Sequence, residues 1–149
     1  RLVVNSNIIQ EKYYETYPEI KGYLNNLVAF CEKNGYVKTI MNRIRYVPEI
    51  HDKNYNIREF GKRVAMNSPI QGSAADIIKK AMIEVDELLV SNKFNTKMIL
   101  QIHDELIFEV PYDELMIVIP LIVEKMENAV NLKVKLKVDY EYGANWYDC

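Results

Sequence analysis

The sequence predicts a mixed α/β (α+β) fold in which an antiparallel sheet is backed by helices. Two short β-rich runs, Lys97–Ile102 and Leu106–Val110, flank a polar tripeptide and indicate a hairpin. Residues 54–92 carry the longest stretch of helical periodicity, and residues 134–142 alternate apolar and charged side chains with a period of two. A hairpin, a long helix and a further strand with one wet face are typical of this class.

The composition is that of an ordinary globular protein of 149 residues, enough for one domain with a core. The sequence begins at Arg1 instead of a methionine, so we expect a fragment of a larger domain. Cys31 and Cys149 lack the spacing of a zinc site or a disulfide framework, which favours a reducing compartment. No apolar run reaches the ~18 residues of a membrane span, and no signal-peptide pattern is present at the start.

Two helices are expected in the first part, over Ile8–Glu15 and Glu19–Lys33, with Pro18 between them and Gly35 ending the second. The apolar and aromatic side chains of these helices fall near helical spacing and are expected to be core. They are Tyr13, Tyr14, Tyr17, Tyr23, Leu27 and Phe30.

A second hairpin is expected within residues 36–50, where β-prone pieces flank Met41-Asn42-Arg43. Asn42 tolerates the left-handed conformation that a tight turn requires. Arg43 and Arg45 lie at or near the tip, where they are candidates for phosphate contact.

The stretch 54–92 is interrupted at Ser68-Pro69, which predicts a helix, a break and a second helix. Arg63 and Asn67 are four residues apart, and Gln71 continues their line past the break. An arginine and two amides can meet the minor-groove acceptors common to all base pairs without reading the base. The alternative is that Asn67 is a helix cap and Gln71 a surface amide.

Small residues, Gly72 to Ala75, begin the second of these helices and allow another backbone to approach closely. A later helical run, Tyr112–Asn131, contains Pro120, which should kink or split it. The alternating residues 134–142 then form the final strand.

The polar tripeptide His103-Asp104-Glu105 is expected at the turn of the first hairpin. Carboxylates at a strand end suit a hard cation such as Mg²⁺, which takes oxygen ligands and keeps several waters. Adjacent strand residues face opposite ways, so one carboxylate is the better candidate ligand, and we choose Asp104. The alternative is an ordinary solvated turn.

The charges are unevenly distributed, although the net charge is only −2. Basic residues dominate between Lys33 and Arg63, whereas acidic residues dominate after Asp104. This asymmetry is expected of a protein that holds DNA on one side and cations at another, or it reflects solvated faces alone.

Two blocks of the sequence, Asn67–Lys79 (NSPIQGSAADIIK) and Gln101–Glu109 (QIHDELIFE), resemble the end of the polymerase domain of family A DNA polymerases of the bacterial DNA polymerase I type. The similarity continues at Tyr14–Ile20, Gly35–Thr39 and Gly143–Trp146, nearly the whole chain. It implies a palm with adjoining finger helices in a bacterial cytoplasmic or nucleoid protein. Residues 1–149 would be the C-terminal part of that domain: helices over 1–35, a hairpin over 36–50, a broken helix over 54–92, and a palm hairpin, helix and final strand over 97–149.

The resemblance also implies template-directed DNA synthesis, with primer-template DNA and dNTP as partners, two Mg²⁺ ions as cofactors, no membrane, and a monomeric parent enzyme. Asp104 would be the second palm aspartate and a metal ligand, and Glu105 a nearby catalytic acid of lesser importance. His103 would lie by the primer terminus, while Arg63, Asn67 and Gln71 would contact the primer-template.

The first palm aspartate, in an Asp-Tyr-Ser motif, and the fingers helix with its lysine and tyrosine do not occur in this sequence. We therefore expect the isolated chain to be inactive. Two alternatives remain: a non-catalytic DNA-binding module, and the palm of a single-subunit RNA polymerase or reverse transcriptase.

Overall fold

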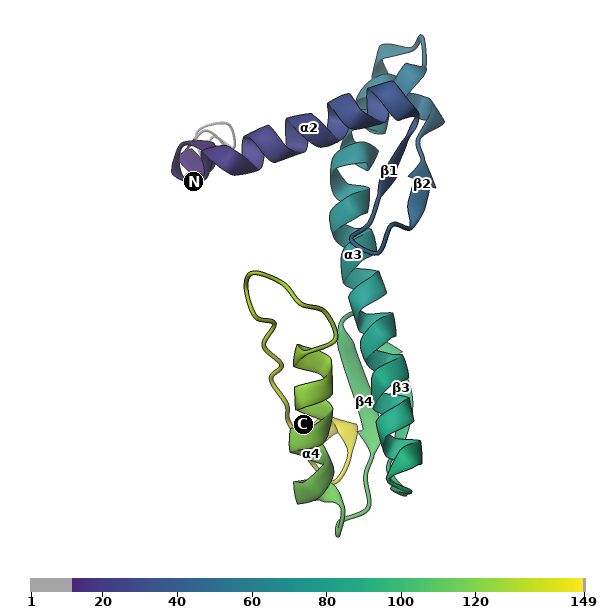
Figure 1. Cartoon of the computed structure of the whole chain (residues 1–149), viewed down its shortest axis with the longest axis vertical. Helices are drawn as coiled ribbons and strands as arrows, with labels where there is room; N and C mark the ends of the chain where they lie inside the picture. Colours follow the sequence, from purple (N-terminus) through teal and green to yellow (C-terminus); the bar gives the residue numbers. More distant parts are fainter. Residues whose placement is uncertain (1–11, 149) are drawn as a thin grey trace. The chain divides into compact units, whose positions relative to one another are not determined.

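The computed structural model describes residues 12–148, and these fall into two compact units that meet along the chain between Ser73 and Ala74. It contains helices and two small antiparallel sheets, so the predicted mixed α/β class is confirmed (Figure 1). Among the described residues, no helix is both long enough and apolar enough to cross a membrane.

The first unit begins with helical residues 12–16 and helix α2 (Pro18–Asn34), close to the two helices predicted there; residues 8–11 of the first prediction lie outside the described residues. Gly35 ends α2 with φ 75°, and its N–H donates to the Cys31 carbonyl at 2.7 Å. Proline at the start and left-handed glycine at the end are the residues that favour these boundaries.

The aromatic side chains of these helices are not core as predicted, since Tyr13, Tyr17, Tyr23 and Phe30 are all exposed. Helix α2 buries only Cys31, near its C-terminal end. The periodicity therefore indicated a helix correctly but overestimated how much of its surface is buried.

Strands β1 (Tyr36–Lys38) and β2 (Ile44–Tyr46) form the predicted hairpin, with Val37 opposite Arg45. Asn42 has φ 62°, the left-handed conformation expected for this residue. A 3₁₀ helix, η1 (Pro48–His51), follows. The core of the unit joins these elements to the helix that follows, α3 (Tyr55–Ser91), and consists of Cys31, Val37, Val47, Ile50 and Ala65.

Helix α3 (Tyr55–Ser91) is one continuous helix of 37 residues that contains Pro69, so the predicted break at Ser68-Pro69 is wrong. Proline removes one helical hydrogen bond and disfavours the helix interior. Here the Ser73 hydroxyl donates to the Pro69 carbonyl, and tertiary contacts described below hold the same turn. The helix thus continues through Pro69 although the local propensity of proline disfavours it.

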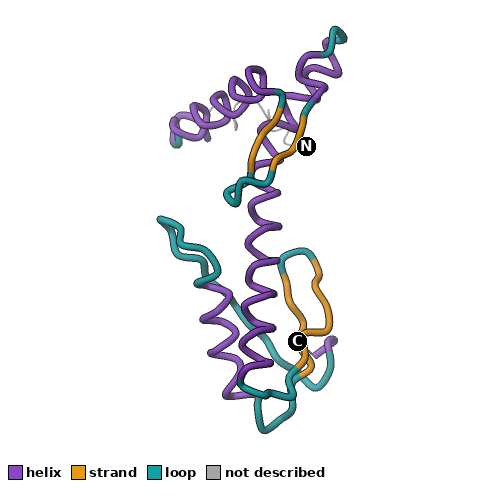
Figure 2. Tube along the Cα trace, turned by 45° about the vertical axis from the view of Figure 1, so that its right-hand side comes forward, coloured by secondary structure: helices purple, strands orange, loops and turns teal. Residues whose placement is uncertain are grey.

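The second unit contains β3 (Lys97–Ile102), β4 (Glu105–Glu109) and α4 (Leu115–Glu127), followed by a short 3₁₀ helix, η2 (Trp146–Asp148). Strands β3 and β4 form an antiparallel hairpin (Figure 2). Their register is interrupted by a bulge between Met98 and Leu100. Pro120 lies inside α4 without splitting it. The core combines residues from α3, α4 and both strands, centred on Val85, Leu89, Val118 and Ile122.

The final strand predicted over residues 134–142 is not formed, because the structure assigns these residues no regular secondary structure. A strand is defined by hydrogen bonds to a neighbour, and the described strands pair only as β1 with β2 and β3 with β4. Residues 134–142 therefore have the side-chain pattern of a strand, but none of the described strands pairs with them.

Candidate nucleic-acid interface

Arg63, Asn67 and Gln71 lie on one exposed face of α3. Because the helix is continuous through Pro69, their spacing of four residues places them in a single row, which is a simpler arrangement than the predicted broken helix. The Arg63 guanidinium carbon lies 5.9 Å from the centroid of the Phe60 ring. The row therefore presents one cation and two amides to solvent from a rigid element.

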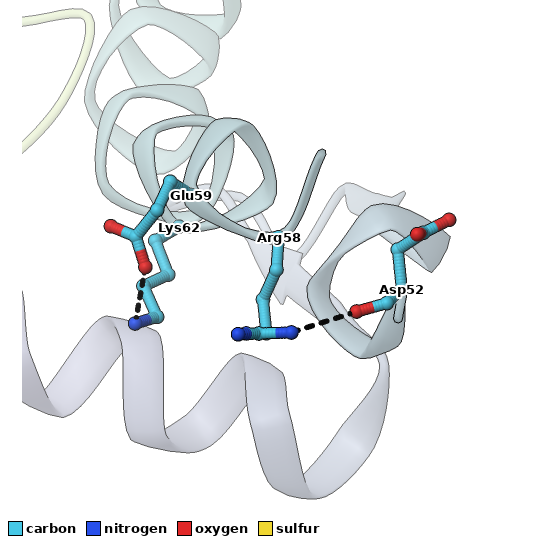
Figure 3. Close-up of polar contacts among 4 residues, drawn as sticks. All are labelled: Asp52, Arg58, Glu59 and Lys62. Carbon is cyan, nitrogen blue, oxygen red and sulfur yellow. Dashed lines mark hydrogen bonds and ion pairs between the residues drawn. The ribbon is translucent and has the colours of Figure 1, made fainter. Parts of the chain in front are cut away.

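Two further cations near the start of α3 are engaged in protein contacts (Figure 3). Arg58 donates from Nη1 to the Asp52 carbonyl at 3.0 Å, and Lys62 Nζ lies 2.7 Å from Glu59 Oε1. The hydrogen bond from Lys62 lowers the pKa of Glu59, and the same bond raises the pKa of Lys62. Both partners thus stay charged near neutral pH, and Glu59 offsets the charge of Lys62.

Arg43 and Arg45, the two arginines considered for phosphate contact, differ in their surroundings. The Arg43 guanidinium donates from Nη2 to the Gly72 carbonyl of α3 at 3.0 Å. Arg45 lies in β2, all three residues of which are exposed. The structure therefore gives Arg43 a partner within the protein.

The β3–β4 hairpin turns at His103 and Asp104 alone, and Glu105 is the first residue of β4, paired with Ile102. The predicted three-residue turn is thus one residue too long, because Glu105 joins the ladder. His103 adopts φ 51°, which is uncommon for a residue other than glycine. The side-chain amide of Gln101 donates to the His103 carbonyl at 2.9 Å and holds this turn.

His103, Asp104 and Glu105 are all exposed. Within residues 12–148 there is no group of three or more histidine, cysteine, aspartate or glutamate side chains that could hold a metal ion. An exposed aspartate at a two-residue turn fits a Mg²⁺ ion that takes one or two protein carboxylates and completes its shell with water and other groups. The exposed Asp104 carboxylate is thus compatible with Mg²⁺ as one ligand among several.

The predicted site residues fall into two sets, one in each unit: the α3 row in the first and the hairpin residues in the second. Sequence reasoning missed the supporting roles of Gln101 and Ser73. It did anticipate a close approach at Gly72, but the neighbour there is a side chain and not another backbone, since a Cβ at Gly72 would lie 2.7 Å from Thr39 Cγ2. The missed contacts are hydrogen bonds that depend on turn geometry, which no periodicity reveals.

Residues 4–148 match the sequence profile of DNA polymerase family A. The chain is 50% identical over 138 residues to DNA polymerase I of Bacillus caldotenax, covering 93% of this chain and 16% of that protein. It is 53% identical over 137 residues to DNA polymerase I of Caldicellulosiruptor bescii, covering 92% of this chain and 16% of that protein. The chain thus spans about one sixth of the length of these relatives.

Among solved structures, the chain is similar to the POL domain of Pol1 from M. smegmatis in complex with DNA primer-template and dNTP. The TM-score is 0.91 at 41% sequence identity, and the match covers 94% of this chain and 25% of that one. The likeness extends through both units and is high in sequence as well as in fold.

Proposed function

This chain belongs to DNA polymerase family A, and from that membership we propose that it forms part of an enzyme for template-directed DNA synthesis in replication and repair. The observation that carries the proposal is the likeness, at 41% identity, to a polymerase domain that was solved with DNA primer-template and dNTP. The reaction is nucleotidyl transfer from a dNTP to a primer 3′-hydroxyl.

Asp104 would hold a catalytic Mg²⁺ ion from the tip of the β3–β4 hairpin. Two Mg²⁺ ions, when bound, stabilise the attacking and leaving oxygens of such a displacement. Asp104 stands at an exposed turn fixed by the Gln101 amide, so its carboxylate is presented on a defined support. Glu105, next along the chain, would contribute negative charge near the ion, and His103 would contact the primer terminus.

Arg63, Asn67 and Gln71 would bind the primer-template through minor-groove acceptors. Purine N3 and pyrimidine O2 accept hydrogen bonds at every base pair, so donors aimed at them bind without sequence preference. A rigid row on one helix face holds such donors at a fixed spacing. This part of the chain would therefore position the duplex, while the hairpin would supply one ligand of the metal site.

The test is primer extension by a polypeptide that contains this chain together with the upstream part of the polymerase, with Mg²⁺ and all four dNTPs. Asp104→Ala should lower the rate by at least about a thousandfold while primer-template affinity stays within about threefold, since removal of a metal ligand acts on the chemical step. Asp113→Ala, at another exposed turn residue of the same unit, is the matched control and should extend normally.

Undiminished extension by Asp104→Ala would overturn the metal-ligand role. With DNA binding intact, that result would favour the alternative in which this segment only holds DNA. Use of ribonucleotides in preference to deoxynucleotides, or of an RNA template, would favour the RNA polymerase or reverse transcriptase alternative.

A further inference from the structure

The tip of the β1–β2 hairpin, residues 39–43, is bonded to one turn of α3, residues 69–73. The Arg43 guanidinium donates to the Gly72 carbonyl at 3.0 Å. The backbone N–H of Ile40 donates to Ser73 Oγ at 2.8 Å, and the Ser73 hydroxyl donates in turn to the Pro69 carbonyl. Two side chains and one backbone amide therefore fasten the tip to the helix.

The tip is itself preorganised. Thr39 and Arg43 close it with a backbone bond of 3.0 Å, the Asn42 N–H donates to the Thr39 carbonyl at 2.9 Å, and the Arg43 N–H donates to Thr39 Oγ1 at 3.1 Å. Gly72 leaves just enough space for this tip, since a Cβ there would lie 2.7 Å from Thr39 Cγ2. The hairpin tip and α3 are thus closely packed at Gly72.

The tip contacts the side of α3 that faces away from the row formed by Arg63, Asn67 and Gln71. At about 100° of rotation per residue, Asn67 and Gln71 lie about 40° and 80° round the helix from Arg63. On the same scale Pro69 lies at about 240° and Gly72 at about 180°. Pro69 is buried whereas the three residues of the row are exposed, so the tip supports the side of α3 opposite the row.

Pro69 makes this turn the weak point of the helix. It has no N–H to donate to the carbonyl of Ala65, and prolines within helices commonly cause kinks. Pro69 also lies between Asn67 and Gln71 along the chain. A bend here would change the distance between the two amides and hence their match to successive base pairs.

We propose that the hairpin tip is a brace that keeps α3 straight at Pro69, so that Arg43 and Ser73 are positioning residues for duplex binding by Asn67 and Gln71. This inference rests on the proposed function of that row. Arg43 thereby acts through the helix and not by contacting a phosphate of the DNA.

Primer-template affinity, measured over a series of salt concentrations in the complete polypeptide, separates the two roles of Arg43. A brace predicts that Arg43→Met weakens binding by about tenfold while the slope of log K against log salt is unchanged. A phosphate contact predicts that the slope falls by about one charge. Ser73→Ala changes no charge and should weaken binding similarly, whereas Lys125→Met, an equal loss of charge in α4, should leave affinity within about twofold.

A double-mutant cycle tests whether Arg43 acts through the row. In a background of Asn67→Ala and Gln71→Ala, the brace predicts that Arg43→Met has less than about a twofold further effect. An independent DNA contact would instead add its full tenfold loss. A reduced salt slope together with additive losses would overturn the brace.

Hydrogen exchange without DNA tests the brace apart from the proposed function. The amides of residues 70–74 should exchange several-fold faster in Arg43→Met and Ser73→Ala than in the wild type. Unchanged exchange in both variants would overturn the brace. If exchange accelerates but Asn67→Ala and Gln71→Ala bind DNA normally, the brace exists and the proposed role of the row is wrong.

Discussion

Glu114 joins two segments of the second unit through one carboxylate. Its Oε1 accepts from the backbone N–H and the side-chain amide of Asn95 at 2.8 and 3.2 Å, and its Oε2 accepts from the backbone N–H and hydroxyl of Thr96 at 2.9 and 2.7 Å. The bond from the Asn95 backbone is the largest of the effects that lower the pKa of Glu114. The ionised carboxylate therefore fixes the loop before β3 to the start of α4.

Glu114→Gln should lower the thermal unfolding midpoint by several degrees at pH 7, because an amide offers one acceptor oxygen where four donors converge. A lowered pKa means that the carboxylate stabilises the fold above its ordinary pKa of 4.5, and that this contribution is lost as pH falls through the lower folded value. The wild-type advantage over Glu114→Gln should therefore shrink below pH 4.5.

Unfolding midpoints of the two proteins, compared between pH 3 and 7, check this prediction. Glu87→Gln, an exposed glutamate in α3, is the control and should unfold like the wild type. An advantage of the wild type that stays constant down to pH 3 would contradict the role given to the ionised carboxylate.

Single residues were predictable from the sequence where their own chemistry decides the conformation. Asn42 was expected to adopt a left-handed turn, and it does. His103 has the same unusual backbone conformation without a sequence signal, because the pairing of Ile102 with Glu105 forces it. The register of the two strands leaves only two residues for this turn, and the propensity of a single residue does not predict that register.

At the scale of elements, two helical glycines differ in what surrounds them. A Cβ on Gly61 of α3 would lie 2.7 Å from the backbone nitrogen of Ile50 in η1. Around Gly22 of α2 nothing lies within 4 Å of such an atom. One glycine allows two backbones to approach, and the other serves no contact among the described residues.

The same substitution should therefore have opposite effects at these two positions. Gly61→Ala should destabilise the protein by about 1–3 kcal/mol, because backbone atoms must move to admit the methyl group. Gly22→Ala should stabilise it by about 0.5–1 kcal/mol through helix propensity. Chemical denaturation of both variants tests the pair, and a stabilising Gly61→Ala would show that η1 does not pack against α3 in this way.

The boundaries of the elements were mostly predictable, but their continuity was not. Proline predicted a break at Pro69 and a kink or split at Pro120, yet α3 and α4 continue through both residues as single helices. The turn at Pro69 is bonded by Ser73 and by a hairpin about thirty positions earlier in the chain. A local pattern cannot reveal a stabilising contact from so distant a segment.

At the scale of the whole molecule, each unit has its own core and its own two-stranded sheet. Both hairpins join neighbouring segments, so short β-rich runs and turn residues sufficed to predict them. Residues 134–142 alternate with a clear period of two but remain without strand structure, since a strand also needs a partner. Two-stranded sheets are marginal on their own, so helix packing carries much of the stability of each unit.

The chain of 149 residues, produced alone, should incorporate no nucleotide into a primer in the presence of Mg²⁺. A two-metal site needs several oxygen ligands in one place. Residues 12–148 contain no group of three candidate ligand side chains, and Asp104 and Glu105 both come from a single hairpin. On the proposed two-metal mechanism, the remaining ligands would come from outside residues 12–148.

The measurement is extension of a labelled primer by the isolated chain, compared with extension by the complete polypeptide at equal concentration. The complete polypeptide shows that the substrates are competent, and its Asp104→Ala variant defines the background. Incorporation by the isolated chain that depends on both Mg²⁺ and Asp104 would show that the hairpin assembles a working site without an upstream carboxylate. Incorporation that persists in the isolated Asp104→Ala chain would point to a contaminating polymerase.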